Sequence, residues 1–107
     1  MNKIVKIALG VVLILGISST TASADISKGQ KLYLKKLKNT CGMNGGTMAS
    51  RHTQAEWEKI HKEGKLVHEI KTICPKAKDK ALEDRFLQHY YDFFHNYGSD
   101  SGNIPSC

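Results

Sequence analysis

The chain has 107 residues, with 16 lysines and arginines against 10 acidic residues and three cysteines. This length allows a single domain. The sequence contains no Gly-x-Ser-x-Gly, phosphate-loop, His-Glu-x-x-His or dinucleotide-binding motif. We therefore expect a basic protein that is not an enzyme.

The first 24 residues have the three regions of a secretory signal peptide. Lys3 and Lys6 precede an apolar run over 7–17, and small residues then lead to Ala22-x-Ala24, where cleavage is expected. The run has eleven residues, well short of the roughly 20 that span a bilayer as a helix. We expect a signal peptide over 1–24 and a soluble periplasmic domain over 25–107 that does not span the membrane.

The mature chain should begin with a helix that ends near Lys38. Ser27 and Gln30 have the spacing of a capping box. Gly29 is costly inside a helix, so its presence predicts a second helix that crosses close to this backbone. A stripe of lysines follows the polar face at helical spacing, consisting of Lys28, Lys31, Lys35 and Lys38. This lysine stripe is either a solvated face or a docking surface for an acidic partner protein or an anionic membrane. It lacks the interleaved aromatic residues expected of a protein that binds nucleic acid.

Residues 40–50 are rich in glycine and have no apolar periodicity, which predicts a loop. The loop and the residues after it contain Cys41, Met43, Met48 and His52. Thiolate, thioether and imidazole groups suit copper or haem iron, so Cys41, Met48 and His52 are candidate ligands, with His52 and Met48 the candidate metal ligands. The alternative is that the methionines fill gaps in the core.

Three further elements complete the prediction. Thr53 and Glu56 form a second capping box that starts a helix ended by Gly64, and a short helix then runs from Leu66 to Pro75. The last helix is expected over 79–97, with one aromatic face. That face consists of Leu82, Phe86, Tyr90, Phe93 and Tyr97, and it is widened by Leu87 and Phe94. The predicted fold class is all-α, with three or four helices.

The three cysteines predict a disulfide in the mature domain. Two of Cys41, Cys74 and Cys107 should pair in an oxidising compartment, but the spacing does not choose among the three pairs. A pair of sequence neighbours would contribute roughly 3.5–4 kcal/mol in the chain-entropy model. The third thiol would stay free, join two chains as a disulfide-linked dimer, or carry a ligand.

This layout resembles a small bacterial class I cytochrome c. The resemblance rests on the Gly29-x-x-x-Tyr33 helix, the Cys41-Gly42 loop, the Trp57 helix and the aromatic last helix. It implies that the first and last helices cross at Gly29 against an aromatic residue of the last helix, and that the protein works in a periplasmic, respiratory-type setting. The chain departs from the family's Cys-x-x-Cys-His haem attachment motif, because it keeps only Cys41 and has Gly42 at the axial histidine position.

Three functional hypotheses follow from the sequence. The first is a periplasmic cytochrome c-like protein associated with respiratory electron transfer, in which haem would depend on the candidate ligands because the attachment motif is incomplete. The second is a haem-free binding or scaffolding module stabilised by a disulfide. The third is a thiol-based or copper-handling protein that uses Cys41.

Overall fold

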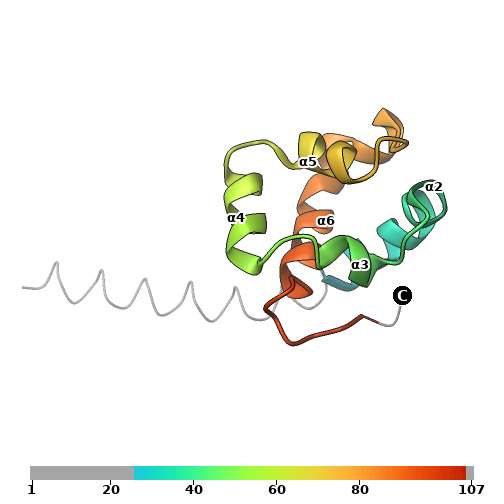
Figure 1. Ribbon diagram of the computed structural model, residues 1–107. Coiled ribbons are helices and arrows are strands. Elements are labelled where there is room, and N and C mark those ends of the chain that lie inside the picture. Colours follow the sequence, from blue (N-terminus) through green and yellow to red (C-terminus); the bar gives the residue numbers. More distant parts are fainter. Residues whose placement is uncertain (1–25, 106–107) are drawn as a thin grey trace, which may run out of the picture.

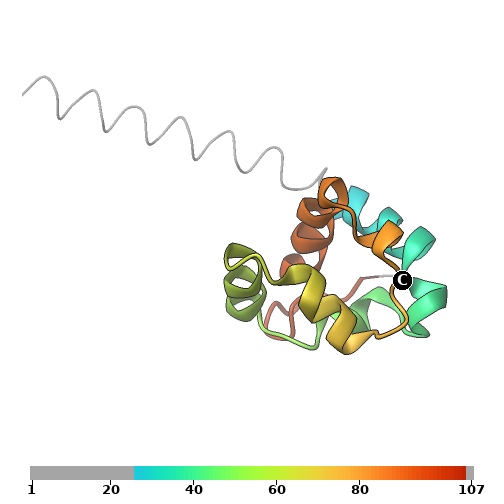
Figure 2. The ribbon, with the colours of Figure 1, turned by 90° about the horizontal axis from the view of Figure 1, so that it is seen from above.

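Helix α6 (Asp84–Asn96) lies at the centre of the domain, with α4 on one side and the first helical segment and α2 on the other (Figures 1 and 2). The computed structural model describes residues 26–105. The remaining elements are a helical segment over 26–36, α2 (Lys38–Cys41), α3 (Gly45–Ala49), α4 (Gln54–Lys62), α5 (Leu66–Ile73) and the 3₁₀ helix η1 (Asp79–Leu82).

The predicted all-α class is confirmed, because the described residues form helices and no strand. The expected number of three or four helices was too low. Six α-helical segments and one 3₁₀ helix occur over 26–105. The predicted signal peptide lies outside the described residues. Among the residues that are described, no helix has the length and apolar character needed to cross a membrane.

Local signals in the sequence place α4 and α5 correctly. The Thr53 hydroxyl accepts a hydrogen bond from the Glu56 amide, and the Glu56 carboxylate accepts one from the Thr53 amide, so the predicted capping box is confirmed. Gly64 has a φ of 70°, in the left-handed region that favours glycine, and ends this helix. Pro75 follows the end of α5, as expected.

Three local predictions are corrected by the structure. The helix already includes residue 26, so Ser27 lies within it and does not cap its start. The predicted loop over 40–50 contains α3, because the Asn44 side chain accepts a hydrogen bond from the Thr47 amide and caps a new helix. The last helix is interrupted at Glu83, whose extended backbone separates η1 from α6.

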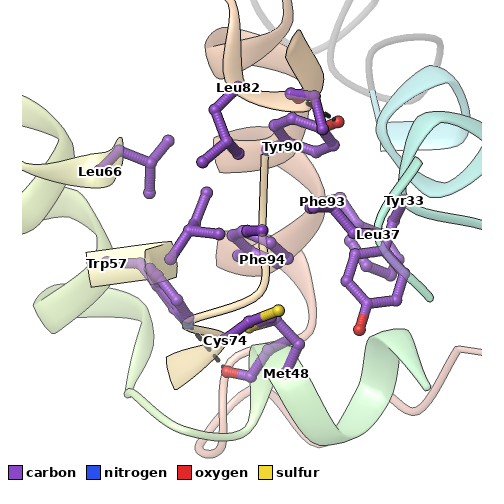
Figure 3. Packing of buried hydrophobic residues seen from close by; sticks show 14 residues of the cluster. Tyr33, Leu37, Met48, Trp57, Leu66, Cys74, Leu82, Tyr90, Phe93 and Phe94 are labelled. Atoms are coloured by element: carbon purple, nitrogen blue, oxygen red, sulfur yellow. Dashed lines mark hydrogen bonds between the residues drawn. The ribbon is translucent and has the colours of Figure 1, made fainter. Parts of the chain in front are cut away.

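The core is built from aromatic rings around Phe94 (Figure 3). The Phe94 ring centroid is 4.7 Å from that of Trp57 and 6.2 Å from that of Tyr33. The polar atoms of the buried rings are satisfied, since the Trp57 indole donates to the Ala49 carbonyl over 2.8 Å. The fully buried aromatic residues are Tyr33, Trp57, Tyr90, Phe93 and Phe94. Phe86 and Tyr97, from the predicted aromatic face, are only half-buried.

The predicted close crossing at Gly29 is present. A Cβ atom at this position would lie 2.0 Å from the His89 carbonyl oxygen and 2.8 Å from the Phe93 Cβ, both in α6. Only a glycine lets the first helix approach α6 so closely. This crossing fixes the direction of the first helix, on which Lys28, Lys31 and Lys35 are exposed to solvent.

Candidate functional site

Cys41 is bonded to Cys74 in a disulfide that connects two distant segments. Cys41 is the last residue of α2, and Cys74 directly follows α5. The prediction that two of the three cysteines pair is confirmed, and the structure selects this pair. Cys107 lies outside the described residues.

His52, the second candidate ligand, is held by two carboxylates. Its Nε2 atom is 2.8 Å from the Glu69 Oε2 atom, and its Nδ1 atom is 3.6 Å from the Glu56 Oε1 atom. The edge of the ring packs against Trp57 at a centroid distance of 4.9 Å. His52 therefore connects the start of α4 to α5.

The methionines of the predicted loop have structural contacts. Met48 is fully buried in the core, as in the alternative reading of a gap-filling residue. Met43 is half-buried, and its carbonyl accepts a 2.7 Å hydrogen bond from the Tyr33 hydroxyl. Within the described residues, no group of three or more histidine, cysteine or acidic side chains is placed to hold a metal ion.

The residues at this site do not fit a covalently attached haem. The Cys41 sulfur is bonded to Cys74, so it has no thiol with which to form a thioether. Gly42, at the position of the family's axial histidine, has no side chain and adopts a φ of 68°. The imidazole of His52 already faces Glu69 and Glu56. Cys41, Met48 and His52 therefore do not form a site that fits a covalently attached haem.

The lysine stripe lies on the solvent side of the first helix. Lys28, Lys31 and Lys35 are exposed, and Lys38 in α2 is half-buried. Across residues 26–105, none of these four lysines takes part in an ion pair. By contrast, the ammonium groups of Lys62 and Lys65 each form an ion pair with a glutamate carboxylate, over 3.4 and 3.5 Å.

The structure contains a second basic cluster that was not predicted from the sequence. Lys36, Thr40, Lys78, Lys80 and Ala81 line a hollow of about 150 Å³ between the first helical segments and the region around η1. The position of residues 75–80 relative to Lys36 depends on tertiary packing, so the sequence alone does not predict this cluster. The close spacing of Lys76, Lys78 and Lys80 is the one feature of the sequence that indicates a basic cluster here.

A larger groove separates α3 from the chain after α6. It has a volume of about 480 Å³. Its lining comes from residues 44–50 and 97–105 and contains no histidine, cysteine, methionine or charged side chain. The groove therefore offers hydrogen-bonding groups and backbone, but none of the candidate ligands predicted from the sequence.

Comparisons of the chain with protein-family models, curated proteins and solved structures find no match. Functional interpretation therefore depends on the residues and their geometry.

Proposed function

We propose that the mature domain is a haem-free, disulfide-stabilised binding module that works outside the cytoplasm and docks an acidic partner protein through the lysine stripe. The observation that carries this proposal is the exposure of Lys28, Lys31 and Lys35 without an ion pair across residues 26–105. The helix that carries them is held on its other side by the close crossing at Gly29.

Electrostatics explains why such a surface suits docking. Several like charges on one rigid face produce a positive potential, which raises the rate of encounter with an acidic surface and orients it. The lysines remain largely hydrated, so their main contribution is to association rate and partner choice, and it weakens as salt increases. The Cys41–Cys74 disulfide supports an oxidising, extracytoplasmic setting, in line with the predicted signal peptide.

Carbodiimide cross-linking in intact cells tests the proposal, because this reagent joins lysines to carboxylates that are in direct contact. We expect cross-links to an acidic exported protein at Lys28, Lys31 and Lys35, and their loss in the triple variant K28Q/K31Q/K35Q. The matched control K59Q/K62Q/K65Q removes the same charge from exposed lysines on and just after α4. Equal losses in the two variants would show that net charge matters and the stripe does not.

Electron transfer remains a second candidate because of one observation, the crossing of the first helix and α6 at Gly29 next to Phe93. The resemblance to class I cytochrome c implied this crossing, but the residues described above do not fit an attached haem. A visible spectrum and an iron assay of protein purified from its native compartment distinguish the two candidates. The binding module predicts a colourless protein without stoichiometric iron, whereas a Soret band with one iron per chain would favour the cytochrome.

The thiol or copper hypothesis requires a reduced Cys41. Mass spectrometry of the native protein without reductant measures whether the Cys41–Cys74 bond is complete. A fully oxidised pair together with no copper binding on titration would exclude this role, and a substantial reduced fraction that binds copper would restore it.

A further inference from the structure

Three lysines from two distant segments surround one small hollow. Lys36 comes from the helical segment 26–36, whereas Lys78 and Lys80 flank the start of η1. Thr40 belongs to the same lining, and a threonine hydroxyl can donate a hydrogen bond. The hollow has a volume of about 150 Å³, which suits a small polar group.

The charge of this hollow is not neutralised by the protein. Asp79 lies between Lys78 and Lys80 in the sequence, but its carboxylate pairs with Lys71 of α5 and does not line the hollow. No acidic residue is part of the lining. Across residues 26–105, Lys36, Lys78 and Lys80 take part in no ion pair. The Lys36 ammonium lies 4.8 Å from the centre of the Phe86 ring, a contact that leaves its charge available.

The backbone on both sides of the hollow is firmly held. The Cys41–Cys74 disulfide directly follows Thr40 on one side and precedes the lysine segment by four residues on the other. On that second side, Ala77 is buried and the Ala81 carbonyl accepts a 2.7 Å hydrogen bond from the Tyr90 hydroxyl. Because both walls are anchored, the three lysines start from fixed backbone positions around the hollow. An anion held between them would offset the repulsion of their like charges.

We propose that this hollow is a binding site for a phosphate group. A phosphate has about two negative charges and several acceptor oxygens, which match three ammonium donors and one hydroxyl better than a single carboxylate does. The site is separate from the lysine stripe and does not depend on the proposed docking function. The phosphate group comes from a free phosphate or from a lipid headgroup, and the experiment distinguishes these sources.

Isothermal titration of the oxidised mature protein with inorganic phosphate is the first arm, and flotation with phosphatidylcholine vesicles that contain or lack phosphatidic acid is the second. We expect one phosphate per chain, and a Kd raised roughly tenfold by each of K36Q, K78Q and K80Q. Binding to phosphatidic acid vesicles without binding of inorganic phosphate would support the same site with a lipid as the source, provided that the same three variants abolish it.

The variant K28Q/K31Q/K35Q is the matched control, because it removes three charges from the neighbouring face of the same helix and leaves the hollow intact. It should change the Kd for phosphate only slightly at physiological salt, where charges beyond about 8 Å are screened. If this control weakens binding as much as K36Q/K78Q/K80Q does, or if neither probe binds, the proposal is wrong. If the wild-type protein binds neither probe but is still cross-linked through the lysine stripe, this site is wrong and the proposed docking function stands.

A second measurement removes the dependence on variants. In an NMR titration of the unmodified protein with inorganic phosphate, the amide signals of Thr40 and Ala81 should shift more than those of residues on α4. Where vesicles are the only ligand, line broadening of the same two amides replaces the shift. Changes spread evenly over the domain would contradict a single site.

Discussion

At the scale of single residues, Gly29 has the greatest structural consequence. The missing side chain lets the first helix lie against the His89 carbonyl of α6, where a Cβ atom would approach to 2.0 Å. The backbone of α6 cannot move aside as a flexible side chain can. Any residue larger than glycine at this position would therefore disturb the packing of the two helices.

Gly29→Ala should therefore be strongly destabilising even though alanine favours helix. We expect a loss of at least about 3 kcal/mol in the free energy of unfolding, measured by urea denaturation. Lys31→Ala, at an exposed position of the same helix, should stay within about 0.5 kcal/mol of the wild type. Similar stabilities for the two variants would mean that the close crossing does not exist in solution.

The stability of the folded protein should depend on pH through the single residue Tyr90. Burial raises the pKa of Tyr90 from its ordinary value of 10.0 to about 12. The folded protein therefore holds the phenol proton more tightly than the unfolded chain does. The resulting stability is fully present below pH 10.0 and is lost as the pH rises through about 12.

Tyr90→Phe tests this assignment. The variant leaves the buried Ala81 carbonyl without its hydrogen bond, so it should lose about 1–3 kcal/mol at neutral pH. It should also lose less stability than the wild type between pH 10.0 and about 12, because the titrating group is gone. Tyr97→Phe is the control, since its hydroxyl makes no hydrogen bond within residues 26–105. Parallel pH profiles for wild type and Tyr90→Phe would assign the alkaline transition to another group.

At the scale of elements, the start of α4 depends on a reciprocal pair of hydrogen bonds. Hydrogen bonding to the Thr53 backbone lowers the pKa of Glu56, although its partial desolvation acts in the opposite direction. A lowered pKa in the folded state means that this contribution is present above the ordinary value of 4.5 and is lost as the pH falls below it. Helix α4 also presents Trp57 to the core, so its start affects the packing of the whole domain.

Thr53→Ala should destabilise the protein by about 1 kcal/mol, because it leaves the Glu56 amide without its acceptor. Glu56→Gln keeps an acceptor for the Thr53 amide and should cost less at neutral pH, while removing the acidic titration. Thermal unfolding followed by circular dichroism at neutral and acidic pH measures both effects. A Glu56→Gln variant that still loses stability with the wild-type acid profile would rule out Glu56 as the titrating group.

At the scale of the whole molecule, the disulfide holds the first helices to the end of α5. It closes a separation of 33 residues, which the chain-entropy model values at roughly 3.5–4 kcal/mol. For a small domain this is a large fraction of the typical stability of about 5–15 kcal/mol.

The double variant C41S/C74S should accordingly lose roughly 3.5–4 kcal/mol relative to the oxidised protein, measured by urea unfolding without reductant. The variant C107S leaves the observed pair intact and should unfold as the wild type does. If C107S were as unstable as the double variant, the pairing would differ from the one described here.

Much of the local structure could be predicted from the sequence, for a physical reason. Capping residues, glycine at the end of α4 and apolar spacing act over one or two helical turns, so the sequence correctly identifies Thr53 and Gly64. It also identifies Tyr90 and Phe93 on the buried side of α6, whereas Phe86 and Tyr97 of the predicted face are only half-buried. The small helix α3 was missed because its stability comes from one Asn44 cap and from burial of Met48, and burial depends on the rest of the fold.

The sequence by itself therefore determined the all-α class, the position of the main helices, the close crossing at Gly29 and the presence of a disulfide. Only the tertiary structure decided that Cys41 pairs with Cys74 and that His52 faces Glu69, 17 residues away. It also decided that Lys36 lines the same hollow as Lys78 and Lys80. Local hydrogen bonds and side-chain spacing are determined by residues that are neighbours in the sequence. Contacts between distant segments exist only after the helices have packed around α6.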